Sequence, residues 1–192
     1  MKRFTVTFLF AVVVFSVRTV IAQDKPSMPS GLRGEMMINA SGVEQKILAL
    51  VSAVPQEKLT WRPAEGVRSI SEVYLHIAGA NYLFPSFAGE KIPDGVNLKT
   101  LEQSTTDKAK ISEIVKTSFA SFRDDLNKLT DADLDKTTKM FGMDATYRNV
   151  YLTALTHMHE HLGQSIAYAR MNGVIPPWTA ERETKMKGEK TK

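Results

Sequence analysis

The sequence TYRNVYLTALTHMHEHLGQSIAYARMN, residues 146–172, is typical of one long amphipathic helix. Ala154, Gln164 and Tyr168 fall on a single, partly apolar stripe when the chain is wound as an α-helix. Gly173 supplies a C-terminal stop, and Pro176-Pro177 should prevent the helix from restarting. A helix of this length with one apolar face needs partners to cover that face.

Three further segments carry apolar residues spaced three and four apart, which predicts three more amphipathic helices. They lie at about residues 35–54, 69–85 and 106–129. Ser69 and Glu72 predict a capping box at the start of the second helix, and Pro85 should kink or end it. Four one-sided helices have to bury their stripes on each other. The sequence therefore predicts an all-α, up-down four-helix bundle with short extra segments.

The first 22 residues differ in character from the rest of the chain. A basic Met-Lys-Arg start precedes an apolar run of about 14 residues and the sequence Val20-Ile21-Ala22, the order found in a secretory signal peptide. The apolar run is shorter than the roughly 20 residues that span a bilayer, so we expect cleavage before Gln23 rather than a membrane anchor. The expected location is periplasmic or secreted, with no membrane association after cleavage.

The rest of the chain divides into three parts. Residues 23–30 predict a flexible leader, residues 31–178 a single bundle domain, and residues 179–192 a mobile charged tail. Within the domain, residues 130–145 are polar and rich in turn formers, with 141–144 as a short extended piece.

Composition excludes several classes of function. Removal of residues 1–22 leaves 22 basic and 21 acidic side chains, so the mature protein is nearly neutral and has no electrostatic motive for binding nucleic acid. The absence of cysteine excludes a lipoprotein anchor, disulfides, thiolate metal sites and a cysteine nucleophile. The sequence also has no Gly-rich phosphate loop and no Gly-x-Ser-x-Gly motif.

The four histidines are the residues best suited to chemistry. His157 and His161 are four residues apart, so they share one face of a helix and can both point at one ion. His159 lies about 200° around the helix from each of them and cannot join. His76 shares an apolar stripe with its neighbours on the second helix, and from a facing helix it would complete a set of three nitrogens. The alternative is that these histidines are solvent-facing or satisfied within the core.

Two motifs resemble the signatures of the DinB/YfiT-like superfamily. The first is WRPAEGVRSI at residues 61–70, followed by His76-Ile77-Ala78. The second is HMHEHLGQ at residues 157–164, although many relatives have Arg where this chain has Leu162. The resemblance implies that His76, His157 and His161 bind a divalent metal ion, usually zinc or nickel, at one end of a four-helix bundle. Such an open three-histidine site is the arrangement of a catalytic centre.

Other polar residues near the motifs have two interpretations each. Gln164 is either a pocket residue that bonds a metal-bound water or orients a ligand, or an amide used in packing. Glu160 is expected to be a solvated charge. Glu72 could accept the second ring proton of His76, but the capping role is favoured. Trp61 is expected to plug the end of the bundle.

Three functions are compatible with these residues. The first is a metal-dependent enzyme with a small-molecule substrate, and the resemblance implies a thiol S-transferase. Because reduced thiols are scarce outside the cytoplasm, a metal-assisted hydrolase stays open beside it. The alternatives are a non-catalytic metal- or ligand-binding bundle, and an interaction scaffold with no metal. Relatives often dimerise through helix faces, so a homodimer is one assembly that the resemblance allows.

Overall fold

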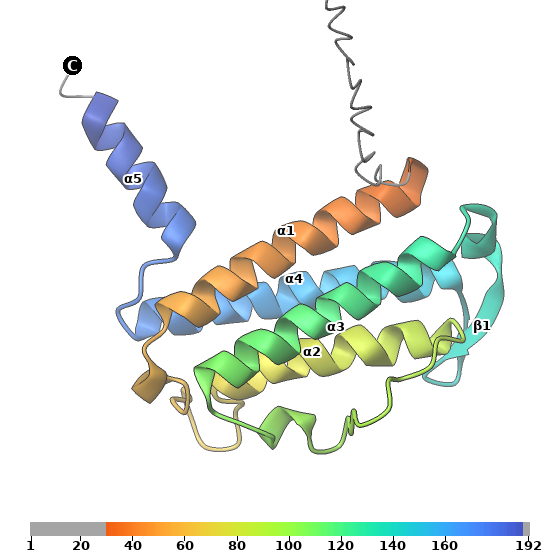
Figure 1. Cartoon of the computed structure of the whole chain (residues 1–192), viewed down its shortest axis with the longest axis horizontal. Helices are drawn as coiled ribbons and strands as arrows, with labels where there is room; N and C mark the ends of the chain where they lie inside the picture. The colour runs from red at the N-terminus through yellow and green to blue at the C-terminus, as the bar shows by residue number, and fades with distance from the viewer. Residues whose placement is uncertain (1–29, 190–192) are drawn as a thin grey trace, which may run out of the picture.

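The structure of the protein is a computed structural model that describes residues 30–189. Four long helices make up most of it (Figure 1). They are α1 (Gly31–Ala53), α2 (Ile70–Phe87), α3 (Lys108–Lys128) and α4 (Tyr147–Met171). The predicted signal peptide and nearly all of the predicted leader lie outside the described residues. Among residues 30–189, no helix is long and apolar enough to cross a membrane.

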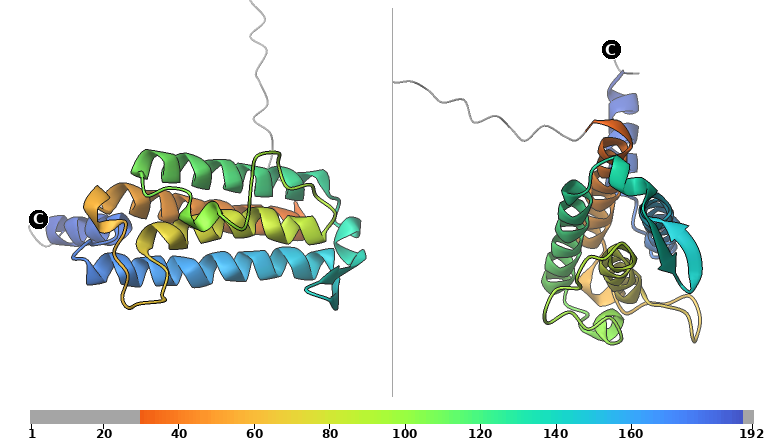
Figure 2. Two further views of the ribbon diagram at one scale, coloured as in Figure 1. Left: turned by 90° about the horizontal axis from the view of Figure 1, so that it is seen from below. Right: turned by 90° about the vertical axis from the view of Figure 1, so that its right-hand side faces the viewer.

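The predicted all-α four-helix bundle is confirmed, and the order of helix directions adds a feature to it. Both α1 and α2 pack against α3 and α4, so α1 and α2 lie on a diagonal of the bundle (Figure 2). Helices α2 and α3 run in the same direction (Figure 1). Their C-terminal ends lie together, where Lys128 at the end of α3 bonds Glu90 just after α2 at 2.9 Å. Strict up-down alternation therefore stops at this pair.

A long connection makes the parallel α2–α3 pair possible. Residues 88–107 leave the end of α2, run back along the bundle and contain the short 3-10 helix η2 (Leu101–Gln103). An 18-residue helix such as α2 is about 27 Å long, which about 20 extended residues can easily span. We call residues 88–107 the crossover. It packs along α2 through η2 and brings polar residues to the side of the bundle.

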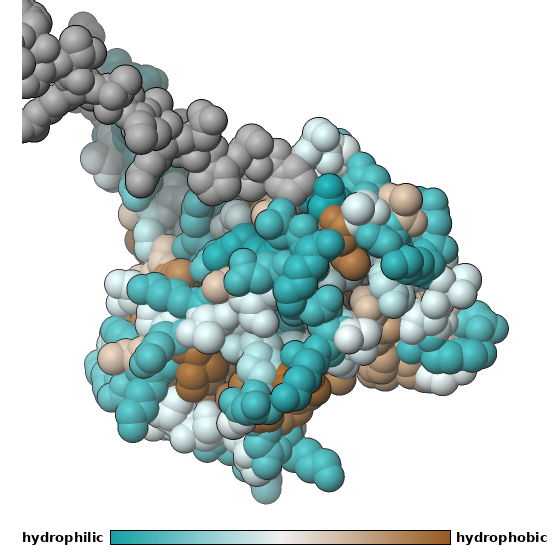
Figure 3. All heavy atoms as spheres, turned by 45° about the vertical axis from the view of Figure 1, so that its right-hand side comes forward, coloured by the Kyte–Doolittle hydropathy of each residue, from teal (hydrophilic) through white to brown (hydrophobic). Residues whose placement is uncertain are grey.

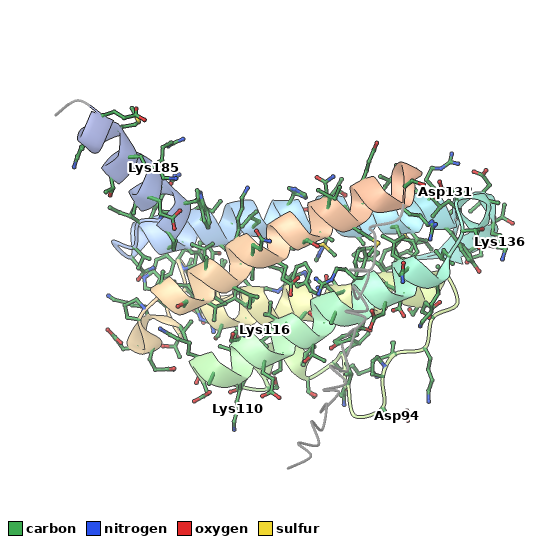
Figure 4. The ribbon with its side chains drawn as sticks, turned by 45° about the horizontal axis from the view of Figure 1, so that its top comes forward. Asp94, Lys110, Lys116, Asp131, Lys136 and Lys185 are labelled. Atoms are coloured by element: carbon green, nitrogen blue, oxygen red, sulfur yellow. The ribbon has the colours of Figure 1, made fainter. Side chains whose placement is uncertain are left out.

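The core is formed by the apolar stripes that the sequence predicted. Phe119 and Phe122 of α3 are fully buried between the helices, together with Tyr74 and Tyr151. Phe122 and Tyr151 meet edge to face, with ring centroids 5.5 Å apart. Charged side chains, including Lys110 and Asp94, project outward (Figure 4). One continuous, tightly packed core thus fixes the positions of the helices relative to one another, and with them the side chains of the site.

The start of α2 has the capping box that the sequence predicted. The Ser69 side chain accepts a hydrogen bond from the Glu72 amide, and the Glu72 carboxylate accepts one from the Ser69 amide at 2.6 Å. Pro85 stands in the last turn, and α2 ends two residues later at Phe87. Because a cap fixes where the first turn begins, it also fixes which way His76 faces.

Residues 130–146 contain more regular structure than expected. After the 3-10 helix η3 (Ala132–Asp135), strands β1 (Thr137–Met140) and β2 (Met143–Thr146) pair antiparallel, with Met140 opposite Met143. Phe141 and Gly142 form the turn between them, with φ angles of 51° and 83°. The expectation of an extended piece at 141–144 was therefore wrong at its first two residues, which reverse the chain.

The expectation that Pro176-Pro177 prevents a further helix was also wrong. Residues Pro177–Glu189 form helix α5, which projects away from the bundle (Figure 1). Proline at the first helical position lacks only an amide that would have no partner there, so it favours a helix start. Glu181 and Lys185 are also spaced to support each other on one face.

Candidate metal centre

Three histidines from α2 and α4 meet inside the bundle. These two helices are antiparallel neighbours, so the first half of α2 lies beside the second half of α4. One ring nitrogen from each of His76, His157 and His161 lies within 4.8 Å of the others. The ring centroids are 4.4–4.9 Å apart. His159 is exposed on the outer side of α4, and its Nδ1 contacts the carbonyl oxygen of Leu155.

Two of the three rings are oriented by partners on Nδ1. His76 Nδ1 lies 2.6 Å from Glu102 Oε1, and Arg68 donates to both carboxylate oxygens of Glu102 at 2.7 and 3.2 Å. His161 Nδ1 lies 2.7 Å from Gln164 Oε1. A carboxylate and an amide oxygen can only accept, so both rings carry a proton on Nδ1, which leaves Nε2 as the nitrogen that can bind a metal ion.

The third ring is held by packing. His157 Nδ1 is buried without a hydrogen-bond partner among the described residues, and the Phe84 ring lies edge-on to it. Burial lowers the pKa of His157 to about 4, and the neighbouring His161 and His76 act in the same direction. Burial also lowers the pKa of His76, against the hydrogen bond that His76 donates to Glu102, which acts to raise it. Both rings are therefore neutral at pH 7, the form that binds metal.

The arrangement suits a divalent metal ion. His76 Nε2 and His157 Nε2 are 3.0 Å apart. Because His76 Nε2 carries a lone pair, such a contact needs a proton or a cation between the two atoms. Two imidazole nitrogens on one tetrahedral zinc would be about 3.3 Å apart, close to the separation found. Three neutral imidazoles do not offset the positive charge of the ion, and they leave one coordination position open.

An apolar cavity of about 380 Å³ adjoins this group. His76, His157 and Glu102 form its polar end, and Phe141 at the tip of the hairpin contributes to its wall. Its other lining residues are Gly79, Ala80, Leu83, Phe84, Leu98 and Leu101. The cavity can therefore hold a small molecule that places a polar group beside the histidines and its apolar part against the other walls.

A second, polar cavity of about 510 Å³ lies on another side of Glu102. Arg62, Arg68 and Gln164 line it, with Glu72 beside them. Arg62 pairs with Glu72 at 3.2 Å and Arg68 pairs with Glu102, so both guanidinium groups already have a carboxylate partner.

Three other residues singled out in the sequence lie on α4 or at the end of the bundle. Gln164 bonds His161 and donates to the Tyr168 hydroxyl at 2.9 Å, so it orients a ring rather than serving only as packing. Glu160 is exposed, as expected. Trp61 is partly buried and meets Tyr168 edge to face at 5.4 Å, as expected of a plug at the bundle end.

Glu102 was missed. Glu72 was the residue considered as a carboxylate partner for His76, but Glu72 forms the helix cap. The carboxylate that meets His76 belongs to Glu102 of the crossover. Glu102 lies 26 residues from His76 in sequence, and no local pattern links the two.

The profile of the DinB superfamily matches residues 41–165, a range that contains all three histidines. The chain belongs to the DinB superfamily. No curated protein is similar enough to count as a match.

Solved DinB-like structures share the fold at low identity. A DinB-like protein from Bacillus cereus ATCC 10987 is 20% identical, with a TM-score of 0.67, over 76% of this chain and 95% of its own. The DinB-like protein YjoA from Bacillus subtilis is 22% identical, with a TM-score of 0.58, over 72% of this chain and 92% of its own. YfiT from Bacillus subtilis is described as a probable metal-dependent hydrolase with an unusual four-helix bundle topology. It is 17% identical, with a TM-score of 0.60, over 80% of this chain and 96% of its own.

Proposed function

We propose that this DinB superfamily member binds one divalent metal ion through Nε2 of His76, His157 and His161 and is a metal-dependent hydrolase of small molecules. The observation that carries the proposal is that two of the three imidazoles line an apolar cavity of about 380 Å³. A site that only stored or used an ion structurally would need no such space beside its ligands.

Each neighbouring side chain has a defined task in this site. A bound divalent ion supplies Lewis acidity, which lowers the pKa of water and polarises a carbonyl group. Glu102 holds the Nδ1 proton of His76, and Gln164 holds that of His161, so both rings keep one tautomer and one orientation. The hydrogen bonds from Arg68 and His76 outweigh the effect of burial and keep the pKa of Glu102 below its usual value. Glu102 therefore acts as a positioning residue and is a poor general base at neutral pH.

The ligand set favours zinc or nickel. Imidazole nitrogen suits both ions, whereas magnesium and calcium prefer oxygen ligands. The chain has no cysteine, so thiolate ligands that would favour other assignments are absent.

Hydrolysis is preferred to thiol transfer on two grounds. The N-terminal sequence supports export, and reduced small thiols are scarce in the periplasm and outside the cell. In addition, the structurally similar YfiT is described as a probable metal-dependent hydrolase. We propose accordingly that the mature chain works outside the cytoplasm on a small-molecule substrate and without nucleic acid.

The test begins with the metal content of protein purified without a polyhistidine tag. About one equivalent of zinc or nickel per chain is expected, together with hydrolysis of some members of a panel of small esters, amides and lactones. A chelator should abolish that hydrolysis, and the metal should restore it. A chain that takes up no metal, or hydrolysis that persists in His76→Ala, would refute the proposal.

A further inference from the structure

The apolar cavity has one polar end and otherwise apolar walls. His76, His157 and Glu102 lie at the polar end, and every other lining residue is apolar or glycine. On the face seen in Figure 3, apolar residues form separate patches among hydrophilic ones. A concave apolar space beside polar groups that can react is the usual construction of a substrate site. Its volume of about 380 Å³ is at the small end of the range for ligand pockets.

Gly79 is the residue that keeps this space open. It lies within α2, where glycine is less favourable than alanine. Its backbone does not require glycine, because an added Cβ would meet only Leu101 Cδ2 at 3.6 Å and Leu98 Cδ2 at 3.9 Å, ordinary contact distances. A longer side chain at this position would project between α2 and the crossover, into the cavity. The missing side chain therefore makes room for a ligand at a cost in helix stability.

Phe141 closes the outer side of the same cavity. It occupies the hairpin turn with a φ of 51°, a left-handed conformation that is strained for a bulky residue. The residue is 60% exposed, and the centroid of its ring lies 4.8 Å from that of the Phe87 ring. Thr138 anchors the hairpin to α2 by donating a hydrogen bond to the Phe87 carbonyl at 2.6 Å. The turn thus holds an aromatic ring over the cavity, where a smaller, less strained residue would serve the hairpin better.

We propose that this cavity binds the apolar part of the substrate, and that Gly79 and Phe141 set the size it accepts. The substrate class is a small molecule that carries a short alkyl chain or a single aryl ring next to the polar group that reacts at the histidines. This inference rests on the proposed function and adds the substrate class and two specificity-determining residues.

A chain-length series of hydroxamates tests the proposal by binding rather than by turnover. Aceto-, butano-, hexano- and octanohydroxamate are titrated into zinc-loaded protein by calorimetry, because the common hydroxamate group binds metal ions and the tail varies. Complete burial of a methylene is worth about fourfold in affinity, so we expect two- to fourfold tighter binding per methylene until the cavity is full, and then a plateau.

Two variants and one control locate the effect. Gly79→Leu should remove most of the gain with chain length and leave acetohydroxamate binding and zinc content unchanged. Phe141→Ala should reduce the increase in affinity that the longer tails give. Because Phe141 lies in the hairpin and not in α2, this variant tests the cavity even if Gly79→Leu folds poorly. The control is Gly42→Leu on α1, another helical glycine with open space around its Cβ position, which should give the wild-type series.

A metal-free measurement separates this inference from the proposed function. Toluene, an uncharged molecule with a single aryl ring, should bind chelator-treated wild type and the Gly42→Leu control, as measured by calorimetry. It should bind Gly79→Leu at least about fivefold more weakly. Toluene binding with this pattern and no metal uptake would support the cavity and refute the metal enzyme. A flat hydroxamate series, or equal toluene binding by wild type and Gly79→Leu, would overturn the cavity proposal and leave the metal site standing.

Discussion

Replacement of Glu102 with alanine should weaken zinc binding about tenfold. The carboxylate lies 2.6 Å from His76 Nδ1, the length of a charge-assisted hydrogen bond. Such bonds are worth about 1.5–3 kcal/mol, and outer partners of metal-binding histidines typically change metal affinity by about 10- to 100-fold. The Glu102 side chain is 33% exposed and shares its charge with Arg68, so solvent should reduce the effect to the lower end of that range.

The assay is competition for zinc with a chromophoric chelator at pH 7.5, using the untagged chain. Glu102→Gln keeps an acceptor without the charge and should fall between wild type and Glu102→Ala. Gln103→Ala is the matched control, because Gln103 is the next residue of the crossover and is exposed, whereas it is Glu102 that bonds His76. Wild-type affinity in Glu102→Ala, or an equal loss in Gln103→Ala, would refute the role assigned to this carboxylate.

Three other predictions concern the ligands, the helix cap and the N-terminus. Alanine at each of the three clustered histidines should remove most of the bound metal, and His159→Ala should remove almost none, as measured by metal analysis; equal losses from all four would indicate loose surface binding. Glu72→Gln should lower Tm at pH 7 by roughly 1–3 °C, because the capping bonds lower the pKa of Glu72 from 4.5 and so stabilise the folded chain at higher pH. That stabilisation is lost as the pH falls through the lowered pKa, so thermal melts of the two proteins should converge in acid, and a constant difference would contradict the assignment. Intact mass of exported protein should show Gln23 as the first residue, whereas a membrane-bound species that keeps residues 1–22 would identify an anchor.

The bundle and the meeting of the histidines were predictable because both depend on helix periodicity. The spacing of His157 and His161 fixes their common face whatever surrounds them. The capping box set the phase of α2 and therefore the direction of His76. Helix periodicity does not determine the directions in which the helices run. These directions depend on the path of the crossover and not on the sequence of any one helix.

The missed features depend on contacts between distant segments. Glu102 faces His76 only because the crossover returns along α2. The hairpin escaped notice because its turn is Phe141-Gly142, and hairpin turns are usually recognised from Asn-Gly or Asp-Gly. Helix α5 was missed because Pro177 was interpreted as a barrier, although a proline in the first turn favours a helix.

The crossover also bears on how proteins of this fold diversify. Helices α2 and α4 carry the three histidines on buried, tightly packed backbones that tolerate little change. Leu98 and Leu101, which wall the cavity, belong instead to a surface connection that can lengthen, shorten or exchange side chains without disturbing the core. Gene duplicates could therefore change the lining of the cavity at crossover residues other than Glu102, while they keep the same histidine cluster.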